Sequence, residues 1–261
     1  MAGVAGKLGV VSASEREQRL VFGEVAQQYD AYRPSYPDGL FDTIIDFGAL
    51  RAGDRALEIG AGTGKATAGF VARGLDVHAL EPSPEMAAVL RARGIDAEET
   101  LFEAWRPPAE PFRLVYAAQA WHWVHGEDRY ERVAAALAPG GTAAFFWNKG
   151  REWTGALGAD NDAVYAEHAP DLTNQQWVLD WVHEGLRACD AFEAPERRTV
   201  TWRRSYTRDE WVRLCGTHSD HRILPDDQRD RLHAAIGDVI DRHGGRVEVV
   251  YDVECYLSRR V

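Results

Sequence analysis

The sequence of 261 residues is poor in lysine, which occurs only at positions 7, 65 and 149. Arginine therefore carries nearly all of the positive charge, and acidic residues outweigh it to give a net charge of −11. A protein that binds nucleic acid or an anionic membrane through a general surface needs a basic face. The charge balance argues against both of these partners. It leaves room for a small anionic substrate, which needs only a local pocket.

Cysteine is also scarce. Cys189, Cys215 and Cys255 are odd in number and far apart, so they predict neither a disulfide framework nor a CxxC metal site. We therefore expect no metal centre.

Long hydrophobic runs are missing as well. The first twenty residues have no continuous apolar core, and no run of about 18 apolar residues occurs elsewhere. We expect neither a signal peptide nor a membrane span, and hence a cytoplasmic protein. The sequence does not indicate an oligomeric state.

Strand and helix patterns alternate over most of the chain, which implies a parallel sheet with helices on both faces. Strands are predicted at 55–59, 76–80, 114–118, 142–147, 197–206 and 247–257. Helices are predicted at 14–30, 39–50, 65–73, 84–93, 127–137, 160–169, 175–188, 208–215 and 226–243. Prolines at positions 34 and 37 separate the first two helices.

This pattern is typical of a doubly wound, Rossmann-like α/β domain with a helical cap inserted after the strand at 142–147. We expect four parts. Residues 1–37 form an N-terminal helix and lid, and residues 38–147 form the cofactor-binding core. Residues 148–195 form the helical substrate cap, and residues 196–261 complete the sheet with further helices.

The most informative segment is the glycine-rich turn at 60–64, where a strand enters three glycines and a helix follows. The start of a helix presents unpaired N–H groups to a ligand. A phosphate-binding P-loop requires GxxxxGK[ST], and this segment has Ile59 at the first glycine and Ala66 at the Ser/Thr position. A dinucleotide site favours GxGxxG, and here Lys65 takes the third glycine position. The P-loop is excluded by two mismatches, and the dinucleotide site is disfavoured by one.

Two acidic residues point to a nucleoside. Glu58 precedes the glycines, and Glu81 ends the next strand, seventeen residues after Gly64. A carboxylate at the end of that strand can accept both hydroxyl groups of a ribose.

Four segments in order carry a family resemblance: ALEIGAGTGKAT (56–67), HALEPSPEM (78–86), AQAWHW (118–123) and LAPGGTAAFFWN (137–148). They resemble the motifs of class I S-adenosylmethionine-dependent methyltransferases. The segments YDAYRPSYP (29–37) and WRRSYTRDEWVRLCGTHS (202–219) are similar to a small-molecule subgroup related to trans-aconitate methyltransferases. One departure is Arg113, where the subgroup commonly has an acid.

The resemblance implies a seven-stranded sheet whose last strand is antiparallel, and S-adenosylmethionine as the methyl donor. It places Gly60, Gly62 and Gly64 at the methionine end of the cofactor and Glu81 at its ribose. Met86, with Phe102 or Glu103, would lie near the adenine, and Gln119 would line the methionine portion. The full set of expected cofactor contacts is Tyr29, Arg33, Glu58, Gly60, Ala61, Gly62, Thr63, Gly64, Glu81, Pro82, Met86, Phe102, Glu103, Gln119 and Ala120.

Two residues are candidates for catalysis. His122 lies between two tryptophans, which favours a neutral imidazole that acts as a general base or orients the acceptor. Tyr29 can face the sulfonium methyl, because an aromatic ring attracts cations. Arg33 can pair with a carboxylate of the cofactor or of the substrate, or form a structural ion pair.

The substrate is expected to contact an aromatic set that continues into the cap. Its members are Tyr36, Trp123, Trp147, Trp153, Trp177, Trp181 and His218. The sequence thus predicts methyl transfer to an oxygen, hydroxyl or carboxylate, of an aromatic or bulky metabolite. Nitrogen or carbon acceptors, an NAD-dependent oxidoreductase, and a protein that binds S-adenosylmethionine without methyl transfer remain alternatives.

Overall fold

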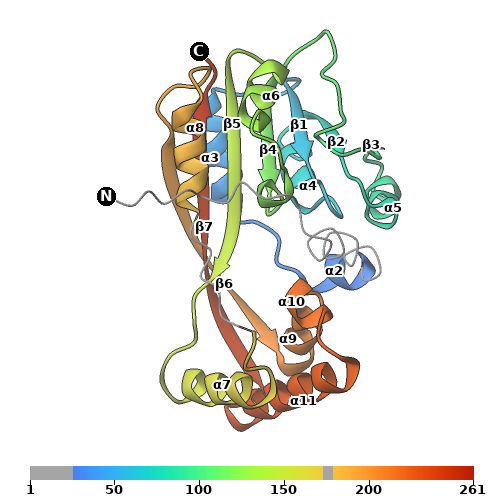
Figure 1. Ribbon diagram of the computed structural model, residues 1–261, viewed down its shortest axis with the longest axis vertical. Coiled ribbons are helices and arrows are strands. Elements are labelled where there is room, and N and C mark those ends of the chain that lie inside the picture. The colour runs from blue at the N-terminus through green and yellow to red at the C-terminus, as the bar shows by residue number, and fades with distance from the viewer. Residues whose placement is uncertain (1–25, 173–178) are drawn as a thin grey trace.

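The computed structural model describes residues 26–172 and 179–261, and it contains one seven-stranded sheet (Figure 1). Trp177 and most of the helix predicted at 14–30 lie outside the described residues. The strands are β1 (Arg55–Ile59), β2 (Asp76–Leu80), β3 (Ala97–Glu98), β4 (Phe112–Ala118), β5 (Leu137–Gly150), β6 (Glu196–Thr207) and β7 (Arg246–Arg259).

The strand order is β3-β2-β1-β4-β5-β7-β6. The first five strands in this order are parallel, and β7 runs antiparallel to both β5 and β6. The predicted doubly wound sheet with an antiparallel last strand is therefore confirmed. The order reverses between β1 and β4, and open α/β sheets bind ligands beyond the carboxyl ends of the strands at such a point.

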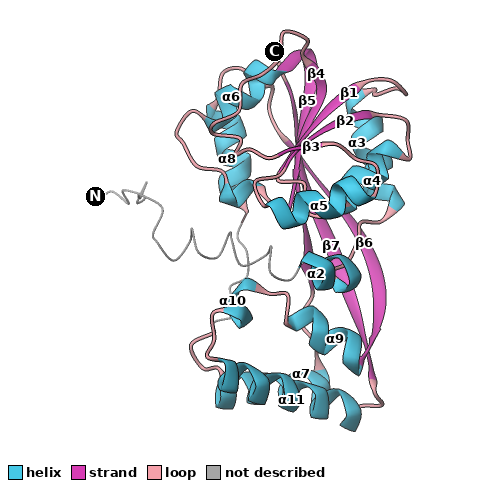
Figure 2. Ribbon diagram, turned by 90° about the vertical axis from the view of Figure 1, so that its right-hand side faces the viewer, coloured by secondary structure: helices cyan, strands magenta, loops and turns pink. Residues whose placement is uncertain are grey.

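Helices cover both faces of the sheet (Figure 2). One face carries α3 (Asp38–Gly48), α4 (Lys65–Val71) and α5 (Pro84–Ala92), and the other carries α6 (Arg129–Ala136) and α8 (Asp180–Ala188). Successive residues of a strand point to opposite faces. Thus Leu57 belongs to the apolar cluster under α6 and α8, and Ala56 belongs to the cluster under α3 and α4.

Strands β6 and β7 extend beyond the other strands of the sheet, and their far ends carry a second lobe (Figures 1 and 2). It consists of these strand ends and the helices α7 (Gly155–His168), α9 (Arg208–Cys215), α10 (Ser219–Arg222) and α11 (Asp226–Arg242). Its apolar core includes Leu232, Ile236 and Ile240 of α11. Helix α2 (Ala26–Tyr32) lies at the junction between the lobe and the sheet.

The structure divides the predicted cap between two places. Helix α7 packs on α11 in the second lobe, whereas α8 buries Val182 and Leu186 against the sheet. The boundaries of the cap, expected at 148 and 195, remain a prediction. The two helices between them, α7 and α8, do not pack together as one unit.

Several elements differ from the sequence prediction. Strand β5 starts at Leu137, before the predicted 142, because Leu137 already pairs with Phe112 of β4. It ends at Gly150, since its far end pairs with β7. The two-residue β3, the short 3-10 helix η2 (Trp121–Trp123) and the four-residue α10 were not predicted, because such short elements leave no periodic pattern. All three cysteines are buried and free. Among the described residues, no helix combines the length and the apolar character that a membrane span needs.

Candidate functional site

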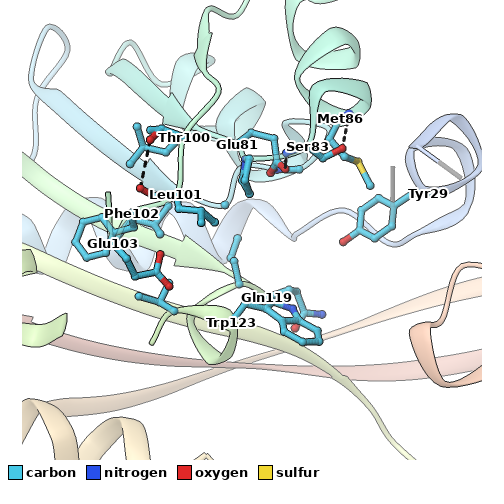
Figure 3. Close-up of a pocket in the computed structure, with 18 residues that line it drawn as sticks. Tyr29, Glu81, Ser83, Met86, Thr100, Leu101, Phe102, Glu103, Gln119 and Trp123 are labelled. Carbon is cyan, nitrogen blue, oxygen red and sulfur yellow. Dashed lines mark hydrogen bonds between the residues drawn. The ribbon is translucent and has the colours of Figure 1, made fainter. Parts of the chain in front are cut away.

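A pocket opens at the carboxyl ends of β1, β2 and β4, where the strand order reverses (Figure 3). Together with the open solvent at its mouth, the pocket spans about 800 Å³. The predicted residues that line it are Tyr29, Gly60, Gly62, Glu81, Pro82, Met86, Phe102, Glu103, Gln119, Ala120 and Trp123. Those that the sequence analysis missed are Ile59, Leu80, Ser83, Thr100, Leu101, Ala118 and Val124.

The three glycines of the turn serve different purposes. Each has a positive φ, which other residues adopt with strain. A Cβ on Gly60 would lie 2.7 Å from the Cβ of Ala120, and one on Gly64 would lie 2.5 Å from Leu90 Cδ2. A Cβ on Gly62 would meet no protein atom within 4 Å. Gly60 and Gly64 thus permit close packing of the turn, whereas Gly62 presents bare backbone to the pocket.

Glu81 ends β2 and stands on the pocket wall (Figure 3). Its Oε2 accepts a hydrogen bond from the Gly62 N–H at 2.7 Å, and its Oε1 accepts one from the Ser83 N–H at 2.8 Å. Ser83 in turn caps α5, where its hydroxyl accepts from the Met86 N–H. The carboxylate is therefore held in place by both the glycine turn and the start of α5.

Glu58 lies in the core behind the turn and does not line the pocket. Its Oε2 accepts hydrogen bonds from the hydroxyls of Thr67 and, at 2.8 Å, of Tyr116. Within the described chain its Oε1 has no hydrogen-bond partner. Burial raises the pKa of this carboxyl to about 7. The structure thus gives Glu58 a place under α4 instead of the cofactor contact expected from the sequence.

Three more expected cofactor contacts do not line the pocket. Ala61 and Thr63 are buried within the turn, and Gly64 forms the N-cap of α4. Ala61 and Thr63 are thus packed in the core of the turn, and Gly64 starts the helix that follows it.

Gln119 follows β4 with a φ of 57°, an uncommon backbone for a residue with a side chain. Its N–H donates to the Phe146 carbonyl at 2.9 Å, and its Nε2 donates to the Asn148 carbonyl at 3.3 Å. Backbone strain of this kind occurs often at functional sites, where the surroundings enforce it. Here β5 holds Gln119 at the pocket.

His122 sits on η2, beside the pocket-lining Trp123 but outside the lining itself. Its Nδ1 accepts a hydrogen bond from the Trp147 indole N–H at 3.2 Å. Burial lowers the pKa of His122 to about 3, so the ring is neutral and its proton resides on Nε2. The expected neutral imidazole is present, but Nε2 can only donate a hydrogen bond in this tautomer. The arrangement therefore favours a donor over a general base.

The N-terminal candidates Tyr29, Arg33 and Tyr36 lie in three different places. Tyr29 reaches the pocket from α2 (Figure 3). Arg33 lies over the Tyr29 ring at 5.3 Å and donates to the Thr217 hydroxyl at 2.8 Å and the Thr217 carbonyl at 3.0 Å. It does not line the pocket, and it joins α2 to the second lobe instead. Tyr36 packs edge-on against Phe146 at 5.0 Å, away from the lining.

The expected aromatic substrate chamber is not gathered in one place. Trp147 and Trp181 touch edge to face on the sheet, with ring centres 6.3 Å apart. Trp153 instead packs on Trp211 in the second lobe, and His218 lies in that lobe too. Trp153 and Trp181 are separated because α7 and α8 pack on different parts of the molecule. Trp177 lies outside the described residues.

Comparison with known proteins bears on this site. Residues 56–141, which include the glycine turn and Glu81, match the family described as a methyltransferase domain. A methyltransferase of Mycobacterium tuberculosis is 36% identical over 185 residues, which span 66% of this chain and 74% of that protein.

Two solved structures share the fold. A structure from Anaeromyxobacter dehalogenans, assigned to the type II methyltransferases, superposes with a TM-score of 0.64 at 22% identity, over 87% of this chain and 98% of that one. The Haemonchus contortus phosphoethanolamine N-methyltransferase 2 in complex with S-adenosyl-L-methionine gives a TM-score of 0.56 at 17% identity, over 97% of this chain and 60% of that one. From the sequence match and the shared fold, this chain belongs to the class I methyltransferase family.

Proposed function

We propose that this protein transfers a methyl group from S-adenosylmethionine to an oxygen atom of a small molecule. One observation carries the nucleoside part of this donor: Glu81 stands on the pocket wall, fixed by the amides of Gly62 and Ser83. The glycine spacing and the methyltransferase-domain match support S-adenosylmethionine over NAD. A carboxylate in this position suits the two adjacent hydroxyls of a ribose. The N–H groups that hold it need no rearrangement on binding.

The rest of the pocket fits the remaining parts of this cofactor. Met86, Leu101 and Phe102 supply an apolar wall that suits a flat adenine ring. The backbone of Gly60 and Gly62 suits the methionine end, because no side chain there prevents close approach. Gln119 lines the same region from β4.

Bound there, S-adenosylmethionine supplies an electrophilic methyl group on a sulfonium sulfur. The protein's own residues then act by position and by exclusion of water. Holding two reactants in line is worth roughly 7–11 kcal/mol of barrier. Tyr29 contributes an aromatic wall near this point, and Arg33 lies over its ring.

The state of His122 bears on the acceptor. A hydroxyl acceptor must lose a proton during transfer, whereas a carboxylate is already ionised at neutral pH. Because Trp147 donates to Nδ1, the proton of the neutral His122 ring lies on Nε2. In this tautomer neither ring nitrogen has a lone pair ready to accept a proton, so we favour a carboxylate, which needs no base, over a hydroxyl.

The aromatic residues near His122 support a bulky acceptor. Trp123 lines the pocket, and the ring of Trp147 lies 6.4 Å from that of His122. The likeness of 29–37 and 202–219 to trans-aconitate methyltransferases agrees with a carboxylate and stays a prediction from sequence. We also propose that the second lobe covers the acceptor, and that the protein works in the cytoplasm on a small molecule rather than on nucleic acid.

Calorimetry with S-adenosylhomocysteine, the product form of the cofactor, tests the donor. We expect one site per chain for S-adenosylhomocysteine and no binding of NADH at the same concentrations. Binding of NADH alone would refute the proposal and favour an oxidoreductase. Once an acceptor is known, the mass spectrum of its methylated product identifies the oxygen, nitrogen or carbon that was modified.

A further inference from the structure

Three histidines and an aspartate meet in the second lobe, away from the pocket at the sheet. His218 caps the start of α10, Asp220 and His221 lie on that helix, and His233 lies on α11. One ligand atom from each of His218, Asp220 and His221 lies within 4.8 Å of the other two. His233 Nε2 lies 3.0 Å from His221 Nδ1. His221 therefore contacts two other histidines, His218 and His233.

The cluster lies partly in the interior of the second lobe. His221 is 2% exposed, and its ring stacks on that of His233 at 5.3 Å. An imidazole binds a metal ion through the lone pair of a ring nitrogen.

We propose that His218, Asp220 and His221 bind a divalent first-row metal ion such as Zn²⁺, with His233 beside them. Two imidazoles and one carboxylate form a donor set that suits these ions, and three protein ligands leave a position for water or a further ligand.

The hydrogen bonds of His221 show how it would bind a metal ion. His221 has a partner at each ring nitrogen, Tyr165 at Nε2 and His233 at Nδ1. A metal ion would replace one of these partners, and the other would keep the ring oriented, as it is in ligating histidines.

The site has a structural consequence. Thr217, which accepts both hydrogen bonds from Arg33, directly precedes His218. A metal ion at the cluster would fix this segment and, through Arg33, the helix α2 that brings Tyr29 to the pocket. The inference does not depend on the proposed methyl donor, because the cluster lies outside that pocket.

The test uses the full chain prepared without a histidine tag, treated with chelator and titrated with Co²⁺ as the probe. We expect one Co²⁺ per chain with visible absorption bands of a nitrogen- and oxygen-ligated ion, and Zn²⁺ displacing it. Saturating Zn²⁺ should raise Tm on the order of 5 °C. Asp220→Asn and His218→Ala should each weaken Co²⁺ binding at least tenfold.

His243→Ala is the matched control, because it removes another histidine of the second lobe that pairs with a carboxylate, Asp160. It should bind Co²⁺ like the wild type. Asp220→Asn conserves shape and guards against loss of the fold, which circular dichroism checks. Absence of Co²⁺ binding by the wild type overturns the proposal, and so does equal binding by the wild type, Asp220→Asn and His218→Ala. Neither result touches the binding of S-adenosylhomocysteine, which separates this test from that of the proposed function.

Discussion

Glu81→Gln changes one atom of the group that we assign to the ribose of the cofactor. In the wild type both carboxylate oxygens accept backbone N–H groups, from Gly62 and Ser83. Glutamine keeps one acceptor oxygen and turns an NH₂ group toward one of these amides, which sets donor against donor. Hydrogen bonds to a charged group contribute about 1.5–3 kcal/mol each.

The loss affects cofactor binding in two ways: the ribose hydroxyls lose a charged acceptor, and the glycine turn loses an anchor. With one such bond lost at each place, the cost is about 3–6 kcal/mol. Each 1.4 kcal/mol is a tenfold change. We therefore expect the Kd for S-adenosylhomocysteine to rise by at least a hundredfold.

Calorimetry of wild type and variant measures this change directly. Glu85→Gln is the matched control, because this exposed acid lies on the first turn of α5 and accepts a hydrogen bond from the Ser83 hydroxyl. It should bind within threefold of the wild type. A Glu81→Gln protein that is folded and binds within threefold of the wild type would refute the ribose assignment.

Three further predictions concern the turn, the core and the histidine. Gly64→Ala would put a methyl group against Leu90 Cδ2 in a positive-φ position, and should lower the unfolding free energy by about 1–3 kcal/mol in urea titrations; an unchanged midpoint would contradict this account. The pKa of Glu58 is about 7 in the folded protein against 4.5 for the free group, so the folded state binds more protons than the unfolded state between these values, and stability falls as pH rises through that window. Glu58→Gln removes this loss, and its stability relative to the wild type should rise by about 3 kcal/mol between pH 4.5 and 7; urea titrations that show a constant difference would refute the assignment. NMR of the imidazole nitrogens should find the proton of His122 on Nε2 and no titration between pH 5 and 8, because the pKa is lowered to about 3. Trp147→Phe removes the donor to Nδ1, so both neutral tautomers should then be populated. A wild-type ring that titrates near 6.5 would contradict the hydrogen-bond assignment.

The sheet was predictable because its strands and helices are long enough to show a period. Strands β1 and β2 agree with the prediction at both ends, since turn residues bound each apolar run. The strand predicted for β5 began only at 142, because Pro139, Gly140 and Gly141 are turn formers in sequence. Pairing with β4 overrides that local preference. The length of β5 depends on partners distant in the chain, which periodicity does not reveal.

The pocket was predictable where a residue type is tied to the backbone, and less so elsewhere. Gly62 and Glu81 were found because a strand that leads into a glycine turn fixes their positions. Ser83 could have been predicted, since Ser-Pro-Glu is typical of a helix start. A residue that caps the helix after β2 lies next to Glu81 and so near the pocket. Thr100 and Leu101 carry no such signal, because they lie in a loop after the two-residue strand β3.

The second lobe shows the limit of local patterns. Arg33 was expected to pair with a carboxylate of the cofactor or substrate, or to form a structural ion pair. It donates instead to Thr217, which is 184 positions away in the chain. The histidine cluster likewise joins α10 to α11. The contact between His221 and His233 depends on how these helices pack, so the spacing of residues in the sequence does not predict it. Both arrangements follow from how α2, α9 and α11 pack at the ends of β6 and β7, a tertiary outcome that the sequence pattern does not contain.

The central claim is methyl transfer from S-adenosylmethionine at the Glu81 pocket. The most direct measurement follows an isotope-labelled methyl group from S-adenosylmethionine into small molecules of a metabolite extract, with mass spectrometry as the readout. We predict a labelled acceptor with the wild type and none with folded Glu81→Gln. A wild-type protein that binds S-adenosylhomocysteine yet labels no small molecule across a broad range of extracts would contradict the account.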